Sequence, residues 1–341
     1  MLRKIIEDEI RAHGPIRLNR YMEICLSHPE YGYYTSQQPF GRKGDFITAP
    51  EISQMFGELV GLWLIHMWQA QGAPERFALV ELGPGRGTLM ADILRIAAVM
   101  PAFLQAARVF LFESSPRLRV EQKERLGKFD IAHIDGLDDM PDMPLYLVAN
   151  EFFDALPIRQ FVKNDFGWQE RLIAEGLAFS LGKTRDMPDL DRKFRGIETG
   201  RIVETRNEAE AMSDVITKKI TTRGGAAIII DYGDYDGVGD TFQAVKQHKM
   251  VDPFAGPGKA DLTAHVRFGE LVQNGVEPGF ATQGEFLARM GIDERRKVLE
   301  KASGKPLGLE QARLIGDDEM GNAFKVLAMW GKPMQHVAGF L

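Results

Sequence analysis

The stretch FALVELGPGRGTL, residues 77–89, decides the fold of this chain. It begins as an apolar run that ends in an acid, Glu81. A turn with three glycines follows: Gly83, Gly85 and Gly87. Beyond the turn, the spacing of apolar residues predicts a helix over 89–99. Strand, glycine turn and helix in this order are typical of a nucleotide site, because glycines let the backbone approach a ligand and the helix N-terminus offers free N–H groups.

The spacing of the turn separates two classes of ligand. A dinucleotide fingerprint requires G-x-G-x-x-G, and its third glycine would stand where this chain has Thr88. The observed pattern is E-x-G-x-G-x-G, with Pro84 between the first two glycines, and this form is associated with S-adenosylmethionine (SAM). The turn therefore favours SAM over NAD(P), with a plain tight turn as a third interpretation. A phosphate-binding P-loop is excluded, because no Lys-Ser/Thr pair follows the glycines.

The composition is that of an ordinary globular chain. Of 341 residues, 44% are hydrophobic and 26% are charged, with a net charge of −6, so no nucleic-acid partner is expected. No apolar run is long enough to predict membrane insertion. A single cysteine, Cys25, excludes an internal disulfide, and the histidines show no metal-ligand spacing. Acids near the N-terminus argue against a secretory or transit peptide, so we expect bacterial cytoplasm or the mitochondrial matrix.

Four segments are predicted along the chain. Residues 1–75 form an N-terminal helical extension that carries a long loop, with a helix over 51–71. Residues 76–157 form the nucleotide-binding half of an α/β domain. Residues 158–224 are an insertion, with a β-meander over 160–181 off the main sheet and then a helix. Residues 225–341 complete the α/β domain.

Short apolar runs separated by helical segments predict a doubly wound, mainly parallel sheet, since such runs are typical of strands buried on both faces. The seven expected strands are 77–81, 109–112, 131–134, 145–149, 226–230, 279–282 and 323–330. The stretch 241–262 is predicted to be a polar loop. A helix over 261–274 is expected to follow, with Asp261 as its N-cap.

Polar residues follow five of these strands: Glu81, Glu113, Asp135, Asn150 and Asp231. In open α/β sheets the ligand crevice lies outside the carboxyl ends of the strands, so these residues are candidates for a cofactor site. Glu113 is predicted to accept hydrogen bonds from both ribose hydroxyls, and Asp135 to meet the adenine amino group. Their neighbours Ser114 and Gly136 complete the predicted cofactor set. An ordinary acid at a strand end is the alternative for both carboxylates.

The segment NEFFDALP, residues 150–157, follows the fourth strand, where a transferase would present its substrate. Methyl transfer depends mainly on orientation and a dry cavity. If the acceptor is an amine or guanidinium, carboxylates can hold its cation and direct a lone pair toward the methyl group. Glu151 and Asp154 are the predicted catalytic pair. The alternative is that Asn150 or Asp154 is the N-cap of a helix, whose dipole favours acids at this position.

Several stretches together resemble the MidA-like methyltransferase family, which includes the mitochondrial complex I assembly methyltransferase. They are HPEYGYYT (28–35), GDFITAPEISQMFGELVGLW (44–63), VELGPGRGTLMADILR (80–95), NEFFDALPIRQF (150–161), IIDYG (229–233), DLTAHVRF (261–268) and EMGNAFKVL (319–327). The resemblance implies a class I SAM-dependent methyltransferase fold with a seven-stranded sheet. It also implies arginine N-methylation of a protein substrate, which for the mitochondrial relatives is a core subunit of complex I.

By position, the resemblance implies a SAM-turn role for the three glycines, a ribose role for Glu113, and closing roles for 44–51 and 150–157. One stretch, 240–248, departs from a family pattern that is more basic and begins with glycine. The predicted substrate contacts are Asp45, Thr48, Pro50, Glu51, Asp231, Tyr232, Asp261 and His265. Two other function classes stay open: a Rossmann-type NAD(P)-dependent oxidoreductase, and a non-catalytic assembly factor that binds SAM.

Overall fold

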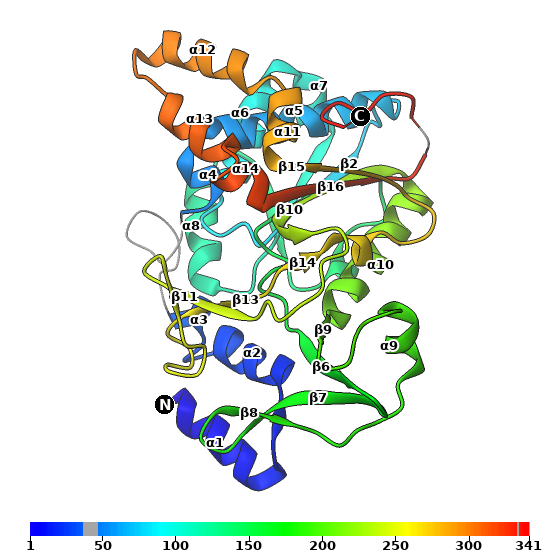
Figure 1. Ribbon diagram of the computed structural model, residues 1–341. Helices are drawn as coiled ribbons and strands as arrows, with labels where there is room; N and C mark the ends of the chain where they lie inside the picture. Colours follow the sequence, from blue (N-terminus) through cyan, green and yellow to red (C-terminus); the bar gives the residue numbers. More distant parts are fainter. Residues whose placement is uncertain (37–46, 333, 341) are drawn as a thin grey trace. The chain divides into compact units, whose positions relative to one another are not determined.

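The structure is a computed structural model that describes residues 1–36, 47–332 and 334–340. The chain forms two compact units, each built from separate stretches of sequence (Figure 1). Unit 1 comprises Met1–Phe46, Asp154–Glu210 and Asp236–His265. Unit 2 comprises Ile47–Phe153, Ala211–Tyr235 and Val266–Leu341. The division into 1–75, 76–157, 158–224 and 225–341 follows chain order and stays a prediction.

Unit 2 contains the main sheet, with strand order β15-β16-β10-β5-β2-β3-β4. Its strands are β2 (Phe77–Leu82), β3 (Ala107–Phe112), β4 (Ile131–Ile134), β5 (Leu145–Asn150), β10 (Gly225–Asp234), β15 (Glu277–Thr282) and β16 (Phe324–Trp330). Neighbours from β10 to β4 are parallel, and β16 runs antiparallel to β10 and β15. All seven predicted strands are confirmed in a Rossmann-like α/β sheet. An eighth, β14 (Val266–Arg267), pairs with the end of β10.

The centre of this sheet is buried on both faces. Every residue of β2 and β5 is buried, as the continuous apolar runs predict. Aromatic side chains of α5 (Gln54–Ala70) and of the strands share this core, including Trp63, Trp68, Phe77 and Tyr146. Burying each such side chain stabilises the fold by about 1.5–3 kcal/mol. The strand ends that carry the polar residues are therefore held by a rigid core.

The predicted helix over 51–71 is interrupted at Ser53. α4 (Ala49–Ile52) ends there, and α5 begins at Gln54. Ser53 has extended backbone angles, and its hydroxyl accepts a hydrogen bond from the Met55 N–H. A serine in this position satisfies a free N–H of the new helix, so the chain ends one helix and starts the next.

The predicted helix over 261–274 is wrong. Asp261–Thr263 forms strand β13, and a 3₁₀ helix covers Phe268–Leu271 after β14. β13 pairs with β11 (Gln243–Lys246), which also pairs with β12 (Lys249–Val251). The predicted polar loop over 241–262 therefore contains two strands of a three-stranded sheet. Asp261 does not cap a helix. Its backbone is extended because it pairs with β11, although the local sequence pattern is typical of a helix N-cap.

Unit 1 has its own sheet, in which β6 (Arg159–Asn164), β7 (Gly167–Ala174) and β8 (Ala178–Leu181) form the meander predicted off the main sheet. β1 (Ile16–Arg17) and β9 (Ile202–Thr205) complete it. Helices α1 (Leu2–His13) and α2 (Leu18–Ser27) bury their apolar faces in a core that includes Ile173 of β7.

α10 (Asn207–Arg223) confirms the helix predicted in the insertion. The remaining helices have four to twelve residues each: α3 (Tyr33–Ser36), α6 (Thr88–Ile96), α7 (Pro101–Ala106), α8 (Pro116–Leu126), α9 (Pro188–Lys193), α11 (Gln283–Arg289), α12 (Ile292–Ser303), α13 (Gly308–Ile315) and α14 (Met320–Ala323). Among the helices that the structure describes, none has both the length and the hydropathy needed to cross a bilayer.

Candidate active site

The turn between β2 and α6 has the backbone that its glycines predict. Gly83, Gly85 and Gly87 have φ angles of 62, 51 and 76°, in the left-handed region that favours glycine. A Cβ atom on Gly83 would lie 2.7 Å from the ring of Phe152. α6 begins directly after the turn at Thr88, so the N–H groups of its first turn lie beside the glycines, and the Met90 N–H donates to Glu81.

Glu113 lies beyond the end of β3, and its carboxylate is buried. Oε1 accepts a hydrogen bond from the Ser115 N–H at 2.8 Å, and Oε2 accepts one from Gln122 Nε2 at 3.3 Å. Burial raises the pKa of Glu113, and these hydrogen bonds oppose the shift. The Ser114 N–H is a third donor to this carboxylate. A carboxylate can accept about four hydrogen bonds, so Glu113 has capacity for a ribose hydroxyl.

Gln122 on α8 is a site residue that no sequence pattern predicted. Its fully buried amide also donates to the Gly85 carbonyl oxygen at 2.6 Å. It therefore links the glycine turn to the carboxylate of Glu113. In the sequence it is one polar residue in the charged helix PRLRVEQKERL, and no motif distinguishes it from its neighbours.

Glu81, at the end of β2, is buried, and its Oε2 finds no hydrogen-bond partner among the described residues. Burial raises its pKa to about 8, and the nearby charge of Glu113 adds to the shift. Asn150 ends the neighbouring strand β5, and its Oδ1 also lacks a described partner. Two buried polar atoms that lack partners among the described residues thus lie at the ends of adjacent strands, and this arrangement fits a polar ligand such as SAM.

Asp135 is linked to the backbone of Glu113 by an arginine side chain. Its exposed carboxylate pairs with Arg119, whose Nε donates to the Glu113 carbonyl oxygen at 2.6 Å. The Gly136 N–H donates to Asp139 at 2.9 Å, and Ser114 is exposed. Adenine contacts for these residues stay a prediction.

Glu151 has an unusual backbone. Its φ angle is 51°, a conformation that strains a non-glycine residue by about 1–3 kcal/mol and is common at functional sites. Its Oε1 accepts hydrogen bonds from Asn150 Nδ2 at 3.0 Å and from the Ala49 N–H at 3.1 Å. The carboxylate therefore lies at the N-terminus of α4, a helix from a distant part of the sequence, and its direction is fixed.

The predicted substrate residues Thr48, Pro50 and Glu51 belong to this same α4 segment, while Asp45 lies outside the described residues. Thr48 is the N-cap of α4 and Pro50 is buried. Glu51 Oε1 accepts a hydrogen bond from Thr88 Oγ1 at 2.6 Å. The segment is thus attached to the first residue of α6, beside the glycine turn.

Asp231 and Tyr232, at the end of β10, hold the backbone near Glu151. The fully buried Asp231 carboxylate accepts hydrogen bonds from the N–H groups of Phe153 and Tyr232, at 3.0 and 2.9 Å. The Tyr232 ring packs edge-on against Phe324 at 5.7 Å. These contacts support a positioning role for both residues; substrate contact stays a prediction.

The two predicted catalytic acids fall in different units, Glu151 in unit 2 and Asp154 in unit 1. Within unit 1, Asp154 and Asp261 are both buried near Tyr34. The Tyr34 hydroxyl donates to Asp261 Oδ1 at 2.8 Å. Burial raises the pKa of Tyr34 well above its ordinary value, and both carboxylates add to this effect.

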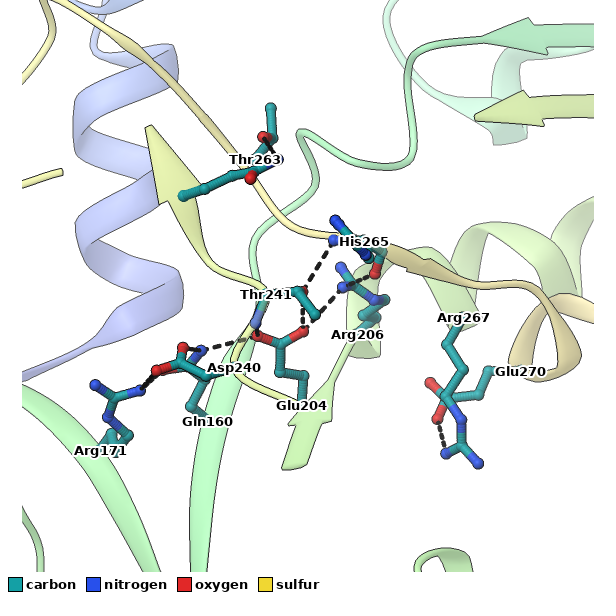
Figure 2. A network of polar contacts seen from close by, with 11 residues as sticks. Gln160, Arg171, Glu204, Arg206, Asp240, Thr241, Thr263, His265, Arg267 and Glu270 are labelled. Atoms are coloured by element: carbon teal, nitrogen blue, oxygen red, sulfur yellow. Dashed lines mark hydrogen bonds and ion pairs between the residues drawn. The ribbon is translucent and has the colours of Figure 1, made fainter. Parts of the chain in front are cut away.

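His265, also in unit 1, has an exposed side chain and a firmly held backbone (Figure 2). Its N–H donates to Thr241 Oγ1 at 3.0 Å, and its carbonyl oxygen accepts a hydrogen bond from the buried Arg206. Both partners bind the carboxylate of Glu204: Thr241 Oγ1 at 2.5 Å and Arg206 Nη2 at 3.2 Å. Gln160 Nε2 binds it too, at 2.8 Å. One buried network therefore fixes both backbone groups of this predicted substrate residue.

Comparison with known proteins identifies the cofactor. A family model described as S-adenosyl-L-methionine-dependent methyltransferase matches residues 59–286. This chain belongs to that family. The matched range includes the glycine turn, Glu113, Glu151 and His265. The methyltransferase is also similar to a Burkholderia thailandensis crystal structure with bound S-adenosylhomocysteine, at 29% identity and a TM-score of 0.85, covering 99% of this chain and 93% of that one.

Full-length relatives carry more specific names. The methyltransferase is 37% identical to the mitochondrial protein arginine methyltransferase NDUFAF7 homolog of Drosophila melanogaster, over 96% of this chain and 84% of that protein. It is 35% identical to the mitochondrial protein arginine methyltransferase NDUFAF7 of Homo sapiens, over 99% and 85%. The class I fold, the SAM cofactor and the methyltransferase activity are thereby confirmed. The NAD(P)-dependent oxidoreductase alternative is wrong.

Proposed function

We propose that this methyltransferase methylates arginine side chains of a protein substrate. The observation that carries the proposal is that relatives aligned over nearly the whole chain are named protein arginine methyltransferases. A guanidinium acceptor also suits the carboxylates that follow the strands, because an arginine pairs with carboxylates through two parallel hydrogen bonds.

In this proposal SAM lies at the glycine turn of unit 2. The backbone of Gly83–Gly87 and the N-terminus of α6 approach its polar groups, and Glu113 accepts hydrogen bonds from its ribose. The buried oxygens of Glu81 and Asn150, which have no partner in the part of the chain that the structure describes, provide further acceptors for its donor groups. The proposed adenine contacts are Ser114, Asp135 and Gly136.

Glu151 and Asp154 are the proposed carboxylates for the acceptor guanidinium. When bound, SAM supplies an electrophilic methyl group, which the arginine nitrogen attacks as the S–C bond breaks, with loss of one proton from that nitrogen. Glu151 holds the guanidinium by its N–H groups and accepts that proton. The left-handed backbone of Glu151 and its bond to the Ala49 N–H keep one carboxylate oriented before the substrate arrives.

A finer proposal concerns the substrate and its compartment. The resemblance to the complex I assembly methyltransferase suggests a core subunit of respiratory complex I as the acceptor. The relatives' names support the mitochondrial matrix as the compartment of a eukaryotic member. A bacterial member would act in the cytoplasm.

Quantitative mass spectrometry of arginine methylation tests the function. Cells lacking this protein are complemented with wild type or with Glu151→Gln, and complex I assembly is followed in parallel. We expect at least one methylarginine that returns with wild type and not with the variant. If no arginine methylation depends on wild type, arginine is not the acceptor and the proposal is wrong, whether or not assembly depends on the protein.

A further inference from the structure

Gln122 joins three parts of unit 2 that meet at the carboxyl ends of the strands. Its amide Nε2 donates to the Gly85 carbonyl oxygen at 2.6 Å and to Glu113 Oε2 at 3.3 Å. Its Oε1 lies 2.8 Å from Nε2 of His133 on β4. The side chain is fully buried, so water does not replace these partners. One amide therefore connects the glycine turn, the carboxylate after β3 and the next strand.

The partners allow only one orientation of this amide. A carbonyl oxygen and a carboxylate both accept hydrogen bonds, so the atom that faces Gly85 and Glu113 is the donating Nε2. Oε1 then faces His133, whose Nε2 carries the hydrogen. Burial, with the cations Arg119 and Lys123, lowers the pKa of His133 and favours a neutral imidazole. The histidine thereby holds the amide with its donors toward the turn.

We propose that Gln122 is a positioning residue for the cofactor, which holds the Gly85 carbonyl and the Glu113 carboxylate in the one arrangement that accepts the adenosine part of SAM. This inference rests on the cofactor site proposed above. Without the amide, the turn and the carboxylate would be free to move independently. Binding would then carry the free-energy cost of ordering both, and affinity would fall without loss of any direct contact to the ligand.

Calorimetric titration of the full-length chain with S-adenosylhomocysteine tests the proposal. Gln122→Met keeps an unbranched side chain of similar length and removes both donated hydrogen bonds. We expect it to bind about tenfold more weakly than wild type. The matched control is Gln283→Met, because Gln283 is equally buried in unit 2 and donates to the Leu314 carbonyl oxygen at 2.8 Å. It should lose thermal stability but keep its affinity within about twofold.

Gln122→Glu adds a second measurement, the pH dependence of the dissociation constant. A purely structural role for Gln122 would not change this dependence. Ionised, the new carboxyl repels Glu113 and leaves the Gly85 carbonyl without a donor; protonated, it supplies one donor again. The ratio of its dissociation constant to that of wild type should therefore rise between about pH 5.5 and 8.5. The surrounding charged and titratable groups are the same in both proteins, so their own titration cancels in the ratio. They are Glu81, Glu113, Arg119, Lys123, His133 and Asp135.

Equal affinity of Gln122→Met and wild type, or equal losses in both methionine variants, would overturn the proposal. A Gln122→Glu ratio that stays constant with pH would do the same, and this measurement decides alone if Gln122→Met does not fold. If wild type binds S-adenosylhomocysteine and Glu113→Ala binds it equally well, the proposed cofactor site is wrong, and the role of Gln122 is rejected with it.

Discussion

The buried carboxyl of Glu81 makes stability depend on pH. Its pKa is raised from 4.5 to about 8 because burial disfavours the charged form. Between these values the folded state keeps a proton that the unfolded state has released. Its contribution to stability is therefore fully present below about pH 4.5 and is lost as the pH rises through about 8.

Replacing this acid should flatten the pH dependence. Glu81→Gln cannot ionise, so we expect its free energy of unfolding to fall less than that of wild type from pH 5 to pH 8, by about 2–4 kcal/mol. Urea denaturation of the ligand-free protein at several pH values measures the difference. Glu124→Gln, at an exposed position on α8, is the control and should follow wild type. Parallel curves for wild type and Glu81→Gln would contradict the prediction.

Among the secondary-structure elements, α5 and α6 show why two glycines occur in a helix. A Cβ atom on Gly57 would lie 2.5 Å from Cβ of Asp92, and one on Gly61 would lie 2.6 Å from Cγ2 of Ile96. Both partners are on α6, the helix that begins at the cofactor turn. The close approach of these helices thus supports the position of the turn.

Gly61→Ala should destabilise the protein although alanine is the better helix former. Overpacking costs about 1–3 kcal/mol and exceeds the gain of about 1 kcal/mol in helix propensity. Thermal and urea unfolding would show the loss. The control is Gly308→Ala in α13, where a Cβ atom meets nothing within 4 Å, and it should be neutral or stabilising. If Gly61→Ala and Gly308→Ala changed the free energy of unfolding equally, α5 and α6 would be able to move apart at little cost.

In unit 1, the network of Figure 2 joins β6, β9 and the loop before β11 to the backbone of His265. Glu204→Gln removes the negative charge beside the buried Arg206. In either orientation, its new NH₂ group faces a donor, the Thr241 N–H or Arg206 Nη2. Breaking a buried ion pair in this way costs about 3–5 kcal/mol.

Urea unfolding measures this loss for Glu204→Gln. Asp189→Asn is the control, because Asp189 pairs with Arg192 at a fully accessible position on α9. Such surface pairs contribute about 0–1 kcal/mol, so this variant should remain close to wild type. A loss in Glu204→Gln no larger than that of the control would show that Arg206 does not depend on this carboxylate.

Across the whole molecule, local patterns predicted the main sheet and its polar strand ends. The runs at 77–81 and 145–149 are apolar because both faces of these strands are buried, so the residues at their ends, such as Glu81 and Asn150, could be located in the sequence. The glycine spacing likewise predicted left-handed backbone at Gly83, Gly85 and Gly87. These features depend on neighbours in the chain.

Features that depend on distant partners were missed. Asp261 lies in a strand because β11 pairs with it. The spacing of apolar residues within 261–274 contains no information about that partner. Gln122 has a role only because α8 brings it against Gly85, a residue far away in the sequence. His265 was selected from its neighbours in DLTAH, whereas the side chains that hold its backbone, Arg206 and Thr241, come from other segments.

The division of each unit among three stretches of chain has a consequence for synthesis. During translation, the strands at 159–181 and the segment 236–265 emerge long after α1 and α2, with which they form one core. The apolar faces of α1 and α2 therefore stay exposed to solvent until most of the chain has left the ribosome. Such long-range closure slows folding and exposes the nascent chain to aggregation, so chaperones that hold amphipathic helices should associate with this protein early in its synthesis.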